Sequence, residues 1–236
     1  RQRNSVHWPA CYTIESETMF ATLEVSVEGP IGRLWLNRPK RLNALSLETL
    51  TELAAAARWF DEQEGVRVVT VGGRGRAFSA GADLDGFPAA ADARVRQAAD
   101  AGRLMAEALE AMRAVTIAGI QGWCVGGGLV LAAACDLRIA ADTARFSIPE
   151  IDLGIPLAWG GIPRLVREIG PALTKELVIT CREFAPAEAH AAGFLNRVVD
   201  AAELEASVEA LASQIAAKPA LPVAATKIHV NAVTAQ

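Results

Sequence analysis

The chain has 236 residues, of which 52% are hydrophobic and 21% charged, a composition that predicts a packed core rather than a disordered protein. Its formal net charge of −4 and isoelectric point near 5.5 argue against a nucleic-acid-binding protein, which usually carries a basic face. The longest apolar stretches are interrupted by Gly, Arg or Asp before they reach the length of a membrane span. We therefore expect a packed domain with neither a nucleic-acid nor a membrane partner.

The cysteines, histidines and N-terminal residues carry little functional signal. The four cysteines and three histidines are scattered, without the spacing of a zinc or redox site. The simple interpretation is a cytoplasmic protein with reduced thiols and no bound metal. Residues 1–18 are polar, begin without Met and lack the apolar segment of a signal peptide, whereas Met19 resembles a natural start. We interpret residues 1–18 as an N-terminal extension or tag remnant.

The first part of the chain alternates strand and helix patterns. Residues 22–27 and 31–36, separated by a Gly-Pro turn, predict a β-hairpin. Residues 46–61 carry apolar side chains at helical spacing, with Ser46 as the predicted N-cap. A short, buried-type strand follows at 67–71. The first unit is therefore strand, strand, helix, strand.

The pattern recurs and then changes. Residues 77–84 read as a strand end and turn, and residues 87–93 are typical of a mobile loop. Three further segments are predicted as one amphipathic helix and two strands: 98–113, 115–120 and 137–140. Residues 126–134 form an almost wholly apolar helix, which must be buried on all sides.

Beyond about residue 171 helical patterns dominate. One strand is predicted at 195–199, and the helices are predicted at 171–180, 186–192, 202–217 and 221–233. We expect an α/β core over residues 19–170, followed by a helical C-terminal portion over residues 171–236.

Two glycine-containing turns have features of a binding site. They are residues 79–84 (SAGADL) and 122–129 (GWCVGGGL). Glycines after a strand and at the start of a buried helix let backbone N–H groups approach a ligand closely. Two such groups that converge would bind a developing oxyanion, although most glycine-rich turns are only turns. Neither segment matches a dinucleotide-binding loop, a Walker loop or a serine-hydrolase elbow.

Residues 146–156 (FSIPEIDLGIP) place the carboxylate of Glu150 between Pro and Ile in an apolar stretch. A carboxyl group in such surroundings tends toward a raised pKa, which suits proton transfer near neutral pH. An ordinary exposed loop glutamate is the competing interpretation, and the local sequence leaves both open. Asp152, two residues on, would point the other way in an extended segment, and we interpret it as structural.

These segments, taken in order, resemble the crotonase superfamily of enoyl-CoA hydratases and isomerases. The matching stretches are LNRPKRLNAL (36–45), AFSAGADL (77–84), GGGLVLAAACDLRIA (126–140), PEIDLG (149–154) and GGIPRL (160–165). The resemblance covers residues 20–235. It implies an α/β spiral of repeated strand–strand–helix units, with a helical C-terminal portion that packs homotrimers, often paired into hexamers.

The resemblance also implies a binding site for an acyl-CoA substrate. By motif position, the backbone N–H groups of Ala82 and Gly127 would form an oxyanion hole for the thioester carbonyl. The family holds the nucleotide and pantetheine of coenzyme A at five further positions, here Lys40, Leu42, Ala80, Asp83 and Leu84. Coenzyme A would enter as part of the substrate, with no permanently bound cofactor.

Departures from the family pattern bear on the reaction. Hydratases of the family hold a water between two glutamates; Glu150 is the second, but Val130 stands at the first position. Valine neither orients water nor relays a proton, and the family's Δ3,Δ2-enoyl-CoA isomerases resemble this arrangement. Dienoyl-CoA isomerases and dehalogenases of the family place an Asp where this chain has Ala158, which argues against both of these activities.

The sequence therefore predicts an isomerase that uses Glu150 to move a proton from C2 to C4 of a 3-enoyl-CoA. A weak or specialised hydratase and a non-catalytic acyl-CoA-binding protein are the alternatives. Val130 and Trp159 are expected beside the acyl group, while simple packing between loops is the competing interpretation for Trp159.

Overall fold

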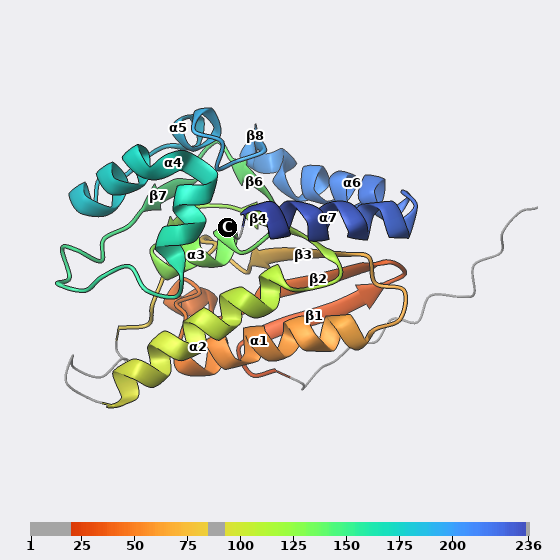
Figure 1. Ribbon diagram of the computed structural model, residues 1–236, viewed down its shortest axis with the longest axis horizontal. Coiled ribbons are helices and arrows are strands. Elements are labelled where there is room, and N and C mark those ends of the chain that lie inside the picture. Colours follow the sequence, from red (N-terminus) through yellow and green to blue (C-terminus); the bar gives the residue numbers. More distant parts are fainter. Residues whose placement is uncertain (1–19, 85–92, 235–236) are drawn as a thin grey trace, which may run out of the picture.

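The computed structural model describes residues 20–84 and 93–234 (Figure 1). The predicted N-terminal extension at 1–18 and residues 87–92 of the predicted loop lie outside the described residues. Within the described part of the chain, no helix is long and apolar enough to cross a membrane.

A six-stranded sheet forms the centre of the molecule, in the order β1-β2-β3-β4-β6-β8 (Figure 1). Strands β1 (Leu23–Glu28) and β2 (Ile31–Leu36) pair antiparallel and confirm the predicted hairpin. The remaining strands join in parallel: β3 (Val68–Gly73), β4 (Val115–Ile120), β6 (Leu137–Ala141) and β8 (Arg197–Val199). Strands β3 and β4 are buried at every position, as expected for parallel strands covered on both faces.

A second layer of short extended segments lies beside the main sheet. Strands β5 (Trp123–Val125) and β7 (Arg145–Ser147) pair in parallel. Single bridges from Leu45 to Ala82 and from Ser79 to Cys124 continue this layer. The sequence did not predict β5 or β7, because three-residue strands show too little alternation to detect.

Helices follow each pass through the second layer. They are α1 (Leu47–Glu62), α2 (Ala93–Glu110), α3 (Gly127–Ala133) and α4 (Gly161–Thr180). The predicted N-cap of α1 is confirmed, since the Ser46 side chain accepts a hydrogen bond from the Thr49 N–H at 3.2 Å. The repeated order of strand, short strand and helix confirms the α/β class and the predicted spiral.

The two faces of the sheet bury different partners. Val69 and Val71 of β3 face the core that contains α1, α2 and α3, whereas Val68 faces α6 (Leu204–Ala216). This alternation follows from the two-residue period of a strand. The face toward α1–α3 therefore carries the larger core and also supports the predicted site segments.

The C-terminal half adds α5 (Pro186–Ala191), the short 3-10 helix η2 (Ala201–Glu203), α6 and α7 (Ala220–Thr234). The helix predicted at 171–180 is confirmed, because α4 consists of two helical segments separated by a kink at Gly170 (φ 75°), and the second segment begins at Pro171. The first segment, which begins at Gly161, was not predicted. Strand β8 and helix α6 complete the main sheet and its core, while α7 has no buried residue. The division into a core and a C-terminal portion stays a prediction.

Candidate active site

Two backbone segments that were predicted to carry an oxyanion hole lie side by side. The Val125 N–H donates to the Ser79 carbonyl at 3.0 Å, which aligns residues 79–82 with residues 123–127. Gly81 (φ +87°) sits at the crossing: a β-carbon there would lie 2.7 Å from the Val125 carbonyl oxygen and 3.5 Å from the Gly127 nitrogen. Only glycine allows both this backbone conformation and this approach.

The Ala82 and Gly127 N–H groups are available for a ligand. Within residues 20–84 and 93–234, neither donates a hydrogen bond to another described residue. Gly127 is the first residue of α3, where a helical N–H has no partner within its own helix. The fold thus brings two unpaired N–H donors to neighbouring segments, which is the arrangement that binds a carbonyl oxygen as it gains charge.

Glu150 lies against the start of α3. Its carboxylate oxygen Oε1 is so close to Gly126 (φ +47°) that a β-carbon at that glycine would collide with it. The other oxygen, Oε2, is buried and accepts no hydrogen bond from the described residues. Backbone hydrogen bonds stabilise the turn that follows Glu150, because the Glu150 carbonyl accepts from the N–H groups of Leu153 and Ile155 at 3.1 and 3.0 Å.

Burial controls the ionisation of this carboxyl group. Desolvation raises the pKa of Glu150 above its usual range, and a hydrogen bond from its own backbone opposes the shift more weakly. The expectation of a raised pKa is therefore confirmed, and the exposed-loop interpretation is wrong for this side chain. A carboxylate with such a pKa binds a proton more readily near neutral pH than an exposed glutamate does.

Val130 and Trp159 both lie beside these groups. Val130 is fully buried one turn into α3, with its Cγ2 at 2.7 Å from the place where a β-carbon on Gly161 would stand. Trp159 is 7% exposed, and its ring packs directly on Gly127. The structure therefore brings Ala82, Gly127 and Glu150 close together and packs Trp159 on Gly127, whereas the Val130 side chain contacts Gly161 of α4. The role of each residue stays a prediction.

The residues predicted to hold coenzyme A form a less uniform group. Lys40 is exposed on the 3-10 helix η1 (Pro39–Arg41), and the Leu42 carbonyl accepts from the Ala80 N–H at 2.9 Å. Leu84 is 54% exposed. These residues lie on two neighbouring backbone segments, 40–42 and 80–84, and Lys40 is open to solvent.

Asp83 differs from the other predicted coenzyme A residues because its side chain is already engaged. Its carboxylate pairs with Arg38 at 2.7 Å and with Arg41 at 3.0 Å. Burial opposes ionisation, but the two guanidinium groups hold the pKa of Asp83 below its ordinary value. Asp83 therefore neutralises two members of the basic cluster around Lys40 and fixes their position.

Two features of the site were missed by sequence reasoning. Gly102 of α2 makes room for the Trp159 ring, and Arg164 binds the carbonyl oxygens of Trp159 and Gly160 at 3.4 and 3.0 Å. A glycine inside an amphipathic helix costs about 1 kcal/mol relative to alanine, so its presence at 102 was a signal of close packing. Arg164 was part of a recognised motif, but only the tertiary structure shows what it binds.

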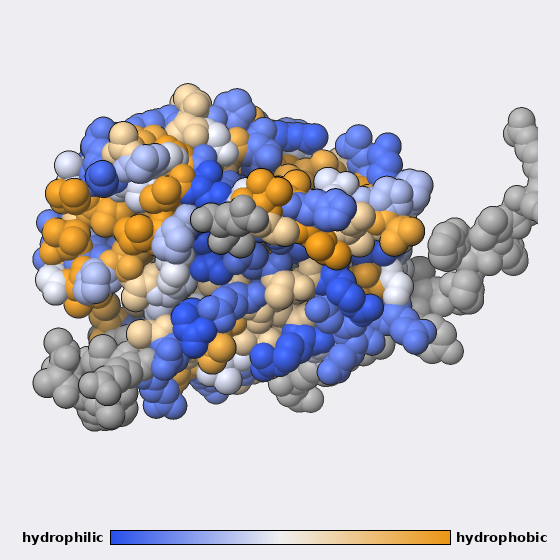
Figure 2. Space-filling view, in the orientation of Figure 1, coloured by the Kyte–Doolittle hydropathy of each residue, from blue (hydrophilic) through white to orange (hydrophobic). Residues whose placement is uncertain are grey.

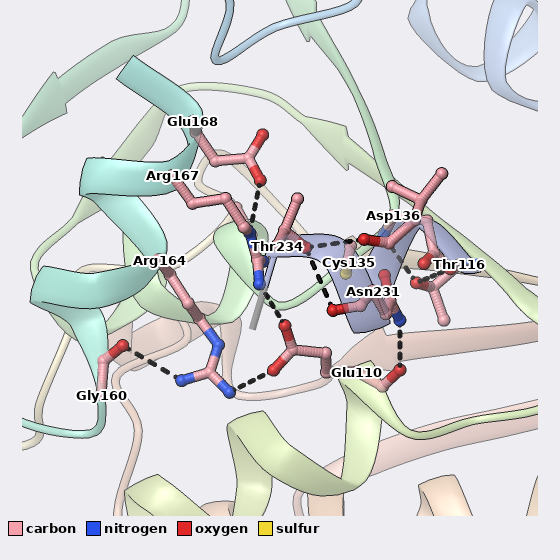
Figure 3. Close-up of polar contacts among 12 residues, drawn as sticks. Glu110, Thr116, Cys135, Asp136, Gly160, Arg164, Arg167, Glu168, Asn231 and Thr234 are labelled. Carbon is pink, nitrogen blue, oxygen red and sulfur yellow. Dashed lines mark hydrogen bonds and ion pairs between the residues drawn. The ribbon is translucent and has the colours of Figure 1, made fainter. Parts of the chain in front are cut away.

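A cavity of about 750 Å³ lies elsewhere, beneath α7. None of the predicted site residues lines it. Figure 3 shows its polar wall, where Glu110 pairs with Arg164 and Arg167 at 2.5 and 2.6 Å. Glu168 pairs with Arg138 at 2.6 Å. The carboxylates of Glu110 and Glu168 are each paired with an arginine, whereas Oε2 of Glu150 accepts no hydrogen bond from the described residues, so the candidate site lies at Glu150.

Metal chemistry finds no support in the described ranges. There, no group of three or more His, Cys, Asp or Glu side chains is placed to hold a metal ion. Two backbone donors and one carboxylate in such an arrangement suit proton transfer next to a carbonyl group.

Comparison with known proteins identifies the family. A family model described as enoyl-CoA hydratase/isomerase matches residues 27–236. The chain belongs to the enoyl-CoA hydratase/isomerase family. A Mycobacterium tuberculosis relative assigned as the enoyl-CoA hydratase echA8 is 37% identical over 213 residues, which cover 90% of this chain and 82% of the relative. Hydratase names prevail among such relatives, but one from Arabidopsis thaliana, 32% identical over 228 residues, is named a dienoyl-CoA isomerase.

Solved structures agree with this family membership. An enoyl-CoA hydratase subunit from Geobacillus kaustophilus superposes with a TM-score of 0.86 at 35% identity, covering 92% of this chain and 84% of that one. A Thermobifida fusca protein assigned as an enoyl-CoA hydratase, also 35% identical, has a TM-score of 0.81 and covers 88% of this chain and 85% of its own. That protein was solved in complex with acetoacetyl-CoA.

Proposed function

We propose that this member of the enoyl-CoA hydratase/isomerase family is a Δ3,Δ2-enoyl-CoA isomerase with a single catalytic carboxylate, Glu150. The proposal rests on one combination: a half-buried Glu150 carboxylate whose Oε2 accepts no hydrogen bond from the described residues, and a fully buried Val130 one turn into α3. By motif position, Val130 stands where hydratases of the family have the other of their two glutamates. One carboxylate is sufficient to shuttle one proton, whereas the family's hydration uses two.

The proposed reaction begins with the thioester oxygen bound by the N–H groups of Ala82 and Gly127. The Glu150 carboxylate removes a proton from C2, and the electron pair of the C–H bond forms an enolate whose charge rests on the thioester oxygen. The C3=C4 double bond then takes the proton from Glu150 at C4, while a C2=C3 bond forms. Glutamate is regenerated as carboxylate, and no other reactant is consumed.

The energetic demands fall on the two N–H groups and on the pKa of Glu150. Loss of one donor from such an oxyanion hole typically costs about 3 kcal/mol in the transition state. The raised pKa of the Glu150 carboxyl reduces the pKa difference between this group and the weakly acidic C2–H of the substrate. Both features support proton transfer without a bound cofactor.

Substrate binding is proposed to follow the same motif positions. The exposed Lys40 ammonium would meet a phosphate of coenzyme A, and Leu42, Ala80 and Leu84 would line the pantetheine. Asp83 would contribute indirectly, because its carboxylate holds Arg38 and Arg41. The acetoacetyl-CoA complex of the Thermobifida fusca relative supports an acyl-CoA ligand for this chain.

Enoyl-CoA hydration is the second candidate. The observation in its favour is that most of the curated relatives are named hydratases. In this case Glu150 alone would activate the water that adds across a 2-enoyl-CoA. The buried Val130 argues against it, since an aliphatic side chain offers a water no hydrogen bond.

One pair of assays separates these functions. The purified protein is incubated with a 3-enoyl-CoA and, separately, with a 2-enoyl-CoA, and both are repeated with Glu150→Gln. Isomerisation that the variant loses supports the proposal. Rapid hydration of the 2-enoyl-CoA by the wild type would overturn the argument from Val130. Tight binding of both thioesters without turnover of either would identify a non-catalytic acyl-CoA-binding protein.

The surface supports a proposal of self-association. Helix α7 exposes Leu221, Ile228 and Val233 at 80%, 64% and 73%. Figure 2 shows further hydrophobic residues gathered over the α4 side of the molecule, where Ile162 and Val166 are 40% and 37% exposed. We propose a homotrimer or hexamer that covers this surface, and sedimentation equilibrium of the full chain tests it. A cytoplasmic location is proposed on the free thiols of Cys124, Cys135 and Cys181.

A further inference from the structure

The ring of Trp159 is held between two glycines on different helices. A β-carbon on Gly102 of α2 would collide with the Cγ, Cδ1 and Cδ2 atoms of the indole, and one on Gly127 of α3 would collide with Cζ3. The ring can therefore occupy this position only because Gly102 and Gly127 both lack a side chain. The ring consequently lies directly on the backbone of Gly127, closer than any residue with a side chain would permit.

The contact places the indole next to the reacting part of the substrate. If the Gly127 N–H binds the thioester oxygen, C2 and the following acyl carbons lie within a few bond lengths of that nitrogen. The Glu150 carboxylate contacts Gly126, the residue before Gly127. The acyl chain that leaves this point toward α2 meets the Trp159 ring, which is only 7% exposed and so already packed on its other sides.

The backbone that carries the Trp159 ring is anchored to the helices beside it. Trp159 has a left-handed backbone (φ 59°), and its carbonyl oxygen accepts from Arg164 Nη1. The same guanidinium binds the Gly160 carbonyl, and its Nη2 pairs with Glu110 at 2.5 Å (Figure 3). Glu110 ends the helix that also supplies Gly102, so the loop and the surface on which the ring rests are joined to each other.

We propose that Trp159 closes the acyl pocket on the α2 side and restricts this enzyme to short-chain enoyl-CoA thioesters. The inference rests on the proposed function for the position of the thioester, and it deepens that function by naming the substrate class. A rigid aromatic wall cannot move aside for added methylenes, and a pocket that excludes one methylene discriminates by about 10- to 200-fold.

The test compares chain lengths in wild type, Trp159→Ala and Trp159→Phe. Trp35→Ala is the matched control, because the Trp35 ring also packs on a glycine, Gly72, but on the main sheet and next to α6. The measured quantity is the ratio of kcat/KM for a four-carbon to a ten-carbon 3-enoyl-CoA. We expect a ratio above about tenfold in the wild type, a fall of about tenfold or more in Trp159→Ala, and a smaller fall in Trp159→Phe.

Binding of saturated thioesters separates failure of this inference from failure of the isomerase proposal. Butyryl-CoA and decanoyl-CoA are titrated by calorimetry into the same four proteins, which requires no turnover. The proposed role of Trp159 is supported if the wild type binds butyryl-CoA more tightly than decanoyl-CoA, and if this preference is lost in Trp159→Ala but retained in Trp35→Ala. This result would support the role of Trp159 even if no isomerisation is found. Equal binding of both thioesters by the wild type overturns it. If Trp159→Ala does not fold, an unchanged ratio in folded Trp159→Phe also overturns it.

Discussion

Glu150 beside the start of α3 and Glu110 beneath α7 are both half-buried glutamates, but they meet opposite surroundings. Glu150 forms no ion pair with the described residues, and its Oε2 accepts no hydrogen bond from them. Glu110 pairs with Arg164 and Arg167. Burial raises the pKa of Glu150, whereas at Glu110 burial is outweighed by the two arginines, which hold the pKa below its ordinary value.

The difference agrees with the proposed catalytic role of Glu150 and with a structural role of Glu110. A buried carboxylate without a partner costs folding free energy, but it takes up a proton readily and is available to a substrate. A carboxylate matched to two guanidinium groups joins α2 to α4 and is unsuited to proton transfer. Each of the following variants changes either the Glu150 site or the polar cluster beneath α7, but not both.

Glu150→Gln is expected to have the largest effect. The amide has nearly the same shape but cannot accept the C2 proton, so isomerisation should fall by about 10²- to 10⁴-fold. The free energy of unfolding should stay the same or rise, because an unpaired buried carboxylate has been removed. Steady-state rates and urea unfolding at the same pH measure both. A variant that isomerises within a few fold of wild type would exclude Glu150 as the proton shuttle.

Glu110→Gln should have the opposite profile. Arg164 and Arg167 lose their anionic partner, and we expect destabilisation of about 2 kcal/mol, less than for a fully buried pair because the side chain retains some exposure. Glu107→Gln is the matched control on the same helix, since Glu107 forms an exposed pair with Arg103 at 2.9 Å. That control should lose no more than about 0.5 kcal/mol. Equal losses in the two variants would contradict a structural role for Glu110.

Lys227→Met tests the attachment of α7 to the cavity wall, with a smaller expected effect. The Lys227 ammonium pairs with Asp136 at 2.8 Å and donates to the Ala114 carbonyl. Asp136 keeps two hydrogen bonds from Thr116 after the change, so we expect a loss of about 1 kcal/mol in urea unfolding. Lys218→Met, at an exposed position, should stay within about 0.5 kcal/mol of wild type. A loss no larger than in this control would mean that the pair does not hold α7.

The pH dependence of stability should distinguish the two glutamates by sign. The raised folded-state pKa of Glu150 makes the folded state bind more protons, so its penalty grows as pH rises from about 4 through that pKa and is then constant. The lowered folded-state pKa of Glu110 gives a stabilisation that is present above about pH 4 and lost as pH falls through that pKa.

Unfolding curves across pH 3–8 for both variants and wild type measure these differences, on a range set by the ordinary glutamate pKa of about 4. The advantage of Glu150→Gln over wild type should increase with rising pH, and the deficit of Glu110→Gln should shrink with falling pH. The isomerisation rate should also rise with pH through the pKa of Glu150. Parallel pH curves for the two variants would contradict the contrast between the two regions.

Local patterns in the sequence predicted much of the fold. The hairpin of β1 and β2, the N-cap at Ser46 and the all-apolar helix α3 follow from period, capping chemistry and composition within a few residues of each position. The second segment of α4, from Pro171 to Thr180, was predicted, and the non-helical Gly170 before it follows the local preference of glycine. The first segment, from Gly161, was not predicted, because Gly161 and Pro163 have the composition of a loop. It is helical in the structure, where Gly161 packs on Val130 of α3.

The candidate site divides in the same way. The sequence alone determined which residues can supply two N–H donors and one carboxylate, since the glycines and Glu150 lie in short ordered motifs. The tertiary structure alone decided that Oε2 of Glu150 accepts no hydrogen bond from the described residues, that Asp83 pairs with two arginines, and that Trp159 lies between Gly102 and Gly127. These outcomes depend on groups far apart in the chain, because desolvation, ion pairing and contact act through space and not along the sequence.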